Sequence, residues 1–271
     1  MAYDTPEQEW RALLSGQHAG MLQLRRTFGR LPAAPRCAWC FAPFHGVGGF
    51  LLRPWFGPWE RNAQLCKNCF AGVKKMGVGG AEIELSRLFA DIRGSTGLGE
   101  QMRPTEFSAL LGSFYRLATK AVVSNLGVLD KFVGDEAIGL FIPAFSGPNH
   151  ADAAIAAGVD LLRAVGRPDA SATGPIPVGA AVHTGVAFAG MVGSSIEISE
   201  FTALGDAMNT TARLAALAGP GELLVSVAAA KHAGLPAGGL ERRSVEVRGR
   251  DAGLDVYAIR PELVREMPKT A

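Results

Sequence analysis

The 271-residue sequence predicts a mixed α/β fold, and three observations support this prediction. From residue 81 onward, apolar runs of strand length alternate with segments whose apolar residues recur every three or four positions. Clusters of Gly and Pro separate these segments, as turns and loops require. Gly and Pro also interrupt the longest uncharged stretch, residues 170–196, so no apolar run reaches the roughly 18 residues of a membrane-spanning helix. We therefore expect a mixed sheet with flanking helices.

The chain is expected to fall into four parts: an N-terminal helix (1–30), a cysteine-bearing module (31–80), a main domain (81–262) and a tail (263–271). The helix is predicted over residues 6–27, because Trp10, Leu13 and Leu14 begin an apolar stripe with helical spacing. Pro32 and Pro35 follow it and end the pattern.

All four cysteines of the chain occur in two Cys-x-x-Cys pairs, Cys37/Cys40 and Cys66/Cys69. Two such pairs supply the four thiolates of a tetrahedral zinc site, which favours one structural Zn²⁺ per chain. Structural disulfides are disfavoured in a cytosolic chain. An iron–sulfur cluster and a thiol redox switch remain alternatives. His45 could replace one ligand, although a surface position is favoured for it.

The main domain is predicted to alternate strands and helices. In the first long helix, Phe107, Leu110 and Leu111 share one face, and Gly127 follows its end. The expected elements are a strand (82–90), a helix (104–125), a hairpin (128–141), a helix (151–165), a strand (175–182) that turns at His183 into another strand, a helix (207–217), a strand (222–227) and a closing hairpin (244–259).

Two isolated carboxylates stand where predicted strands end. Asp135 follows Gly134 at the tip of a hairpin within Lys131–Phe141, and Asp91 ends a strand that runs into a Gly/Ser/Thr loop. Mg²⁺ is usually held by one or two carboxylates together with substrate phosphates, and free loop amides can bind the anion. Either aspartate by itself would be more readily explained as a turn residue, which Asp commonly is. Together they indicate a metal–triphosphate site.

The charge of the chain is uneven. Residues 1–80 carry ten Lys/Arg and four Asp/Glu, a net charge of +6, whereas residues 81–271 carry 17 and 21, a net charge of −4. A basic segment could contact nucleic acid, but a solvated surface is favoured, so no nucleic-acid partner is expected. Because the N-terminus lacks the pattern of a secretory signal, we expect a cytoplasmic protein without a membrane partner.

Three separated motifs occur in a characteristic order: Phe89-Ala-Asp-Ile-Arg-Gly-Ser-Thr, Lys131-Phe-Val-Gly-Asp, and Leu204-Gly-Asp-Ala-Met-Asn-Thr-Thr-Ala-Arg-Leu. Over about residues 85–260 the chain closely resembles the class III nucleotidyl cyclase catalytic domain, the domain of adenylyl and guanylyl cyclases. The resemblance implies a ferredoxin-like, palm-type mixed sheet with flanking helices. It leaves the helix and the cysteine module, residues 1–80, unmatched.

The resemblance also implies roles for individual residues. Asp91 and Asp135 match the aspartates that hold two Mg²⁺ or Mn²⁺ ions per active site, and Lys131 and Thr202 match the pair that recognises adenine. Asn209 and Arg213 match the transition-state pair on one helix face. The triphosphate is expected to contact Arg248 and the loop residues Ile92, Gly94, Ser95 and Thr96.

These matches imply an adenylyl cyclase that converts ATP to 3′,5′-cyclic AMP and pyrophosphate in sites shared across a homodimer. A guanylyl cyclase and a non-catalytic nucleotide-sensing protein, with the zinc module binding a partner, are the alternatives. Pro177 departs from the family pattern, since some members carry a phosphate-contacting Arg there; Arg93 or Arg103 could replace it.

Overall fold

The computed structural model describes residues 3–31, 35–60, 62–195, 199–236, 238–246 and 253–261. The chain divides into two compact units. Unit 1 comprises Met1–Glu84, Ile142–Pro148 and Val186–Leu204, and unit 2 comprises Leu85–Phe141, Asn149–Gly185 and Gly205–Ala271. Two long strands, β3 (Gly79–Ile92) and β6 (Val178–Gly193), belong to both units.

The sheet of unit 2 is mixed, as the sequence predicts. Its strands follow the order β4-β5-β3-β6-β8-β10-β9. The pairing is parallel between β6 and β8 and antiparallel for β3/β5, β4/β5, β8/β10 and β9/β10. The remaining strands are β4 (Val128–Val133), β5 (Glu136–Phe141), β8 (Leu223–Ser226), β9 (Glu241–Val245) and β10 (Leu254–Ile259).

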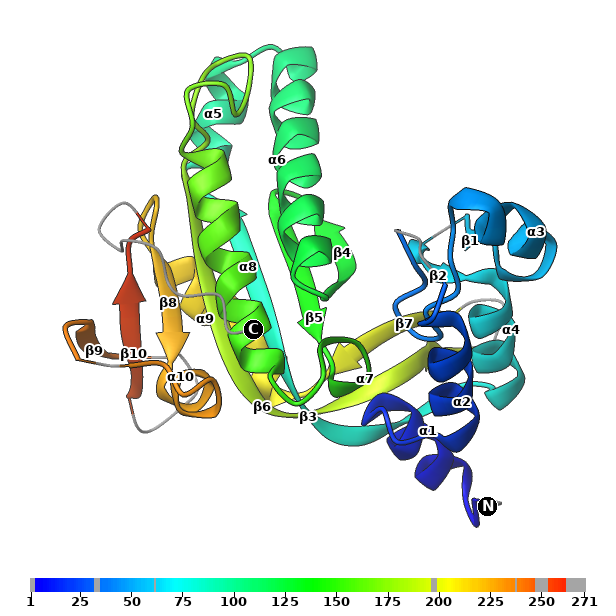
Figure 1. The fold of residues 1–271 in the computed structure, drawn as a ribbon. Coiled ribbons are helices and arrows are strands. Elements are labelled where there is room, and N and C mark those ends of the chain that lie inside the picture. Colours follow the sequence, from blue (N-terminus) through cyan, green and yellow to red (C-terminus); the bar gives the residue numbers. More distant parts are fainter. Residues whose placement is uncertain are drawn as a thin grey trace. The chain divides into compact units, whose positions relative to one another are not determined.

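Two amphipathic helices, α6 (Pro104–Ser124) and α8 (His150–Val165), lie side by side along the sheet of unit 2 (Figure 1). Their apolar faces enter one core with the sheet, in which Phe114, Ile155 and Leu88 are almost completely buried. Each Å² of apolar surface removed from water contributes about 25 cal/mol, so this core is the main stabilising feature of the unit. The shorter helices are α5 (Ser95–Gln101), α9 (Asp206–Leu217) and α10 (Val227–His232).

Unit 1 contains the N-terminal helices and the cysteine module. Its elements are α1 (Pro6–Leu14), α2 (Ala19–Phe28), α3 (Gly46–Phe56), β1 (Pro58–Trp59), β2 (Asn62–Cys66), α4 (Lys67–Met76), α7 (Pro143–Ser146) and β7 (Ser199–Leu204). The strand β7 pairs antiparallel with the unit 1 portion of β6.

The single helix predicted over residues 6–27 is wrong, because the chain forms two helices there. Gly16 adopts a positive φ of 77°, which ends α1. His18 then caps α2, its Nδ1 accepting a hydrogen bond from the Met21 amide at 3.3 Å. The apolar stripe continues across this break, so periodicity alone could not reveal it.

The turn predicted at His183 is also absent. β6 continues through it, and His183 is buried with its Nδ1 2.8 Å from the Ser226 hydroxyl. His183 is therefore a core residue of the sheet. The hairpin over residues 128–141 is confirmed, with Gly134 at a φ of 60° in its turn. The tip of the closing hairpin between β9 and β10 lies outside the described residues.

Gly79 and Gly80 lie in β3, although the glycines of this region suggest a joint between domains. A Cβ on Gly80 would come within 2.2 Å of the Ala189 carbonyl oxygen, and one on Gly190 within 2.2 Å of the Gly79 oxygen. The glycines therefore allow β3 and β6 to approach closely within unit 1. Among the described residues, no helix combines the length and apolar character needed to cross a membrane.

Candidate functional site

The two predicted metal aspartates meet at one end of the sheet of unit 2. Asp91 lies near the end of β3 and pairs in register with Glu136, the first residue of β5. Asp135 lies in the turn that precedes β5, and its carbonyl oxygen accepts a hydrogen bond from the Ile92 amide at 3.3 Å. The β-ladder therefore brings together two carboxylates that stand far apart in the sequence, and their side chains interact directly.

The carboxylates of this cluster titrate abnormally. Burial, reinforced by neighbouring Asp135, raises the pKa of Asp91 to about 6. Burial and the same two aspartates raise the pKa of Glu136 to about 7. Burial also opposes ionisation of Asp135, but its interactions with Ser95 and Asp91 bring the pKa of that carboxyl below its ordinary value. Negative charge is therefore concentrated here beyond what the surrounding protein neutralises.

The arrangement fits a divalent cation. Oδ1 of Asp91 is buried and has no hydrogen-bond partner among the described residues. A buried carboxylate oxygen without a donor is unfavourable, and a cation would satisfy it while relieving the repulsion between the aspartates. Carboxylate oxygens are also the ligands that Mg²⁺ and Mn²⁺ prefer. Asp91 and Asp135 are thus the residues that would hold the metal.

Arg93 is a charged residue beside Asp91, and the sequence did not reveal its contacts. Its Nη2 pairs with Oδ2 of Asp91, its Nη1 donates to the Ala216 carbonyl at 2.8 Å, and its amide donates to the Pro177 carbonyl at 2.6 Å. Arg103, the other candidate to replace a missing phosphate contact, instead pairs with Glu106 at the start of α6 and is largely exposed. Of the two, only Arg93 contacts a predicted metal-binding aspartate in the described chain.

Tyr115 on α6 supports the turn that carries Asp135. Its hydroxyl donates to the Gly134 carbonyl oxygen, and its ring stacks on Phe132 with centroids 4.0 Å apart. Neither contact follows from the sequence motifs. The only signal in the sequence is an aromatic residue on the helix face beside the hairpin. Tyr115 and Arg93 are therefore neighbours of the predicted metal site that tertiary contacts reveal.

The Gly/Ser/Thr loop after β3 connects to α5 beside Asp135. Gly94 adopts a φ of 70° directly before this helix. The Ser95 side chain contacts Asp135, and the Ile92 amide is already engaged by the Asp135 carbonyl. Thr96 lies in the first turn of α5. The assignment of Ile92, Gly94, Ser95 and Thr96 to the triphosphate stays a prediction.

The remaining predicted site residues lie on three elements. Lys131 is half-buried on β4, opposite Ile138 of β5. Asn209 is exposed and Arg213 is half-buried on α9, and their i, i+4 spacing places them on one face of that helix. Thr202 lies on β7 in unit 1, where it is buried and pairs with Gly190. Arg248 lies outside the described residues.

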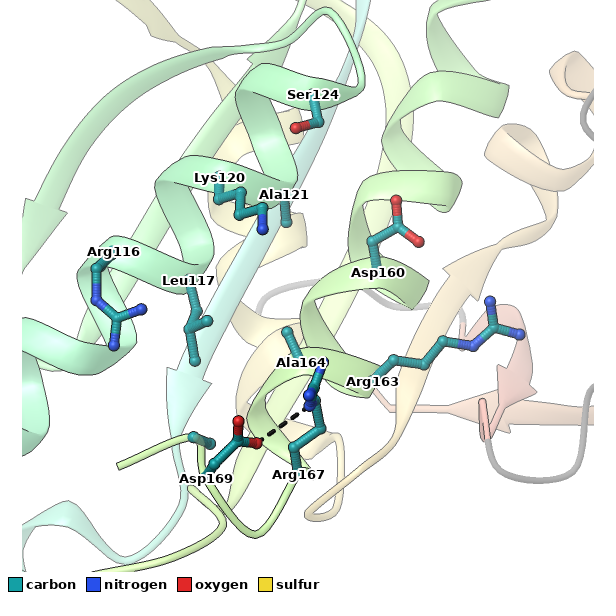
Figure 2. Close-up of a pocket in the computed structure, with 11 residues that line it drawn as sticks. Arg116, Leu117, Lys120, Ala121, Ser124, Asp160, Arg163, Ala164, Arg167 and Asp169 are labelled. Atoms are coloured by element: carbon teal, nitrogen blue, oxygen red, sulfur yellow. Dashed lines mark hydrogen bonds and ion pairs between the residues drawn. The ribbon is translucent and has the colours of Figure 1, made fainter. Parts of the chain in front are cut away.

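A surface groove of about 480 Å³ lies between α6 and α8 (Figure 2). Figure 2 shows Arg116 and Lys120 on the α6 side and Asp160 and Arg163 on the α8 side. Their side chains are exposed, and none of the predicted site residues lines the groove. We therefore do not assign the catalytic site to it.

The four cysteines form a second candidate centre in unit 1. All four are buried, and their sulfur atoms lie within 4.8 Å of one another. The Cys37–Cys69 and Cys40–Cys66 sulfur distances are 3.8 and 3.6 Å. Zinc–sulfur bonds of about 2.3 Å in a tetrahedron give an edge of roughly 3.8 Å, so the spacing fits tetrahedral Zn²⁺.

Two backbone amides donate hydrogen bonds to sulfur atoms of the cysteine cluster. The Cys66 amide donates to the Cys37 sulfur and the Cys69 amide donates to the Cys66 sulfur, each at 3.3 Å. Hydrogen bonds among the four thiols lower the pKa of Cys37 and raise the pKa values of Cys40 and Cys69. His45 is exposed at the start of α3 and does not belong to the cluster.

Comparison with known proteins agrees with the fold and the motifs. The family described as the adenylate and guanylate cyclase catalytic domain matches residues 82–260, and the chain belongs to this family. An adenylate cyclase of Anabaena cylindrica is 28% identical over 203 residues, which are 70% of this chain and 39% of that protein. The uncharacterized protein Rv1318c of Mycobacterium tuberculosis is 33% identical over 154 residues, which are 56% of this chain and 28% of that protein.

Solved structures of cyclases share the fold. The guanylyl cyclase Cya2 superimposes with a TM-score of 0.60 and 24% identity, covering 67% of this chain and 93% of that one. The adenylyl cyclase CyaB from P. aeruginosa gives a TM-score of 0.58 and 24% identity, covering 70% and 98%. Since the similar proteins carry both names, the comparisons establish a cyclase catalytic domain without deciding between ATP and GTP.

Proposed function

We propose that the protein is an adenylyl cyclase that converts ATP to 3′,5′-cyclic AMP and pyrophosphate. The observation that carries this proposal is the juxtaposition of Asp91 and Asp135 at the end of β3 and at the β4–β5 turn, with a buried carboxylate oxygen that lacks a partner among the described residues. In the reaction, the ribose 3′ oxygen attacks the α-phosphorus, the bond from that phosphorus to the bridging oxygen breaks, and pyrophosphate leaves.

Asp91 and Asp135 would hold two Mg²⁺ or Mn²⁺ ions per active site. When bound, such ions favour the deprotonated 3′ oxygen and offset the charge of the triphosphate. The hydrogen bond from Ser95 is one of the interactions that lower the pKa of the neighbouring Asp135 carboxyl. Arg93 orients Asp91 through its ion pair. Arg248 and the loop from Ile92 to Thr96 would bind the phosphates.

The choice of ATP rests on Lys131 and Thr202. A lysine ammonium donates hydrogen bonds and a threonine hydroxyl can donate or accept them, which suits the N1 acceptor and the amino donor of adenine. Asn209 would orient the ribose, and Arg213 would neutralise charge that develops on the transferred phosphorus. Loss of one such electrostatic contact typically lowers the rate about a hundred- to a thousandfold. As a homodimer, the protein would combine the aspartates of one subunit with the base-recognising residues of its partner.

The cysteine cluster would hold one structural Zn²⁺ per chain, supported by its sulfur spacing and its amide donors. A cytoplasmic location is part of the same proposal. Guanylyl cyclase activity is the second candidate, because a similar solved structure bears that name.

An assay of the purified chain with Mn²⁺ and either ATP or GTP tests the proposal. Cyclic AMP is expected as the main product, and Asp135→Ala is expected to abolish its formation. Cyclic GMP as the main product would favour guanylyl cyclase activity. Full activity of Asp135→Ala would refute the assigned metal site.

A further inference from the structure

One side chain of unit 1, that of Trp39, connects the cysteine cluster with the strand that carries Thr202. Trp39 lies between Cys37 and Cys40 and is 1% exposed. Its ring packs edge-on against Phe201 of β7, with centroids 5.6 Å apart and planes at 81°. It also packs against Phe145 of α7 at 5.3 Å. Phe201 directly precedes Thr202, so the cysteine turn contacts the neighbour of the predicted base-recognising residue.

The backbone around Trp39 is held by the cluster and by Arg25. Arg25 donates from Nε to the Trp39 carbonyl at 2.6 Å and from Nη2 to the Ala38 carbonyl at 3.1 Å. It also donates to the Ala144 carbonyl, next to Phe145. The cation lies beside sulfur atoms that would be thiolates in a metal site, and its charge favours them. The turn is thus fixed on both sides of Trp39.

The position of strand β7 depends on side-chain packing such as the contact between Trp39 and Phe201. Among the described strands it pairs with β6 alone, so its other edge has no backbone ladder. Successive side chains of a strand point to opposite faces, so Phe201 receives Trp39 on one face while Thr202 projects from the other. A shift of Phe201 therefore moves the backbone that positions Thr202.

The Trp39 side chain acts through the packing of its ring and not through a hydrogen bond. Its Nε1 is buried and has no hydrogen-bond partner among the described residues. An unpaired buried donor is unfavourable, so the contact with Phe201 and Phe145 depends on the ring surface. Phenylalanine would keep most of that surface and lose only the unpaired donor, which makes Trp39→Phe a conservative variant.

We propose that Trp39 is a positioning residue for nucleotide recognition, through which the metal-bound cysteine turn sets the place of β7 and Thr202. This inference rests on the proposed function, in which Thr202 contacts the base. It assigns the zinc module a role in substrate selection in addition to folding.

Hydrogen exchange of the full-length, zinc-loaded chain tests the structural step without any activity. Trp39→Ala is expected to increase amide exchange in residues 199–204, and Trp39→Phe to leave it nearly unchanged. Trp59→Ala is the matched control, because Trp59 stacks on Phe70 within the same module at 3.7 Å. Exchange in β10 should stay constant in all variants. Unchanged exchange of residues 199–204 in Trp39→Ala would overturn the proposal.

Kinetics then test whether the contact reaches the substrate. Trp39→Ala is expected to raise KM for ATP about fivefold, the effect of weakening one neutral hydrogen bond, and to reduce the preference for ATP over GTP, with kcat changed less. Increased amide exchange in β7 together with an unchanged KM and an unchanged preference for ATP over GTP would refute the role in recognition. Wild-type protein inactive on both nucleotides would refute the proposed function, whereas the exchange experiment would still decide the coupling. If Trp39→Ala loses zinc or fails to fold, Phe201→Leu tests the same contact from the other side and gives the same expected result.

Discussion

Tyr115→Phe separates the support of the Asp135 turn from the chemistry of the site. The substitution removes the hydroxyl that donates to the Gly134 carbonyl and retains the ring that stacks on Phe132 at 4.0 Å. A hydrogen bond of this kind contributes about 1 kcal/mol to stability, and less where water can replace it. We therefore expect the free energy of unfolding to fall by up to about 1 kcal/mol.

The turn carries a predicted metal ligand, so its loosening should also weaken metal binding. If the same 1 kcal/mol is lost from the metal-competent arrangement, the Mn²⁺ concentration for half-maximal activity rises about fivefold. Activity at saturating Mn²⁺ should return close to that of the wild type, because Tyr115 does not contact the reacting atoms.

Two measurements check this prediction: chemical denaturation and a Mn²⁺ titration of activity. Tyr115→Leu serves as the comparison, since it also removes the aromatic stack and should cost about 1 kcal/mol more. A Tyr115→Phe variant with the wild-type Mn²⁺ midpoint would refute the argument that the hydroxyl holds the turn. A loss of activity that excess Mn²⁺ does not restore would also contradict it.

Three further predictions concern the metal centres, the dimer and pH. Elemental analysis should find about one zinc per chain. Cys69→Ser should lose the zinc and unfold unit 1, because structural zinc contributes on the order of 10 kcal/mol to folding. Iron in place of zinc, or metal-free thiols in a folded chain, would contradict this. Mixing Asp91→Ala with Arg213→Ala should restore part of the activity through hybrid dimers, and none at any ratio would exclude shared sites. Burial, His232 and Arg87 lower the pKa of His150 to about 4, so the contribution of His150 to the free energy of unfolding should fall by up to about 3 kcal/mol as pH drops from about 6.5 to 4. The raised pKa values of Asp91 and Glu136 act in the opposite direction over this range. The His150 contribution is therefore measured as the difference between wild type and His150→Gln in a pH series of denaturation curves, and a difference that does not change with pH would contradict it.

The sequence predicted the hairpin of β4 and β5 well, because Gly134 and Asp135 specify a tight turn between apolar runs. It failed where a local signal competed with long-range pairing. A turn was predicted at His183, but backbone pairing and the contact with Ser226 keep β6 extended. It also missed the break between α1 and α2, because Gly16 and the His18 cap act within an apolar stripe that continues beyond them.

The sequence by itself determined the chemical groups: the cysteine pairs, the two aspartates and the ordered motifs that define a cyclase domain. These are local patterns, and residue type and spacing suffice to specify them. Only the tertiary structure decided which side chains support these groups. Arg93 pairs with Asp91, Tyr115 holds the Gly134 turn, and Trp39 packs on Phe201. Such contacts join segments far apart in the chain, and they arise from packing and hydrogen bonding that no short stretch of sequence contains.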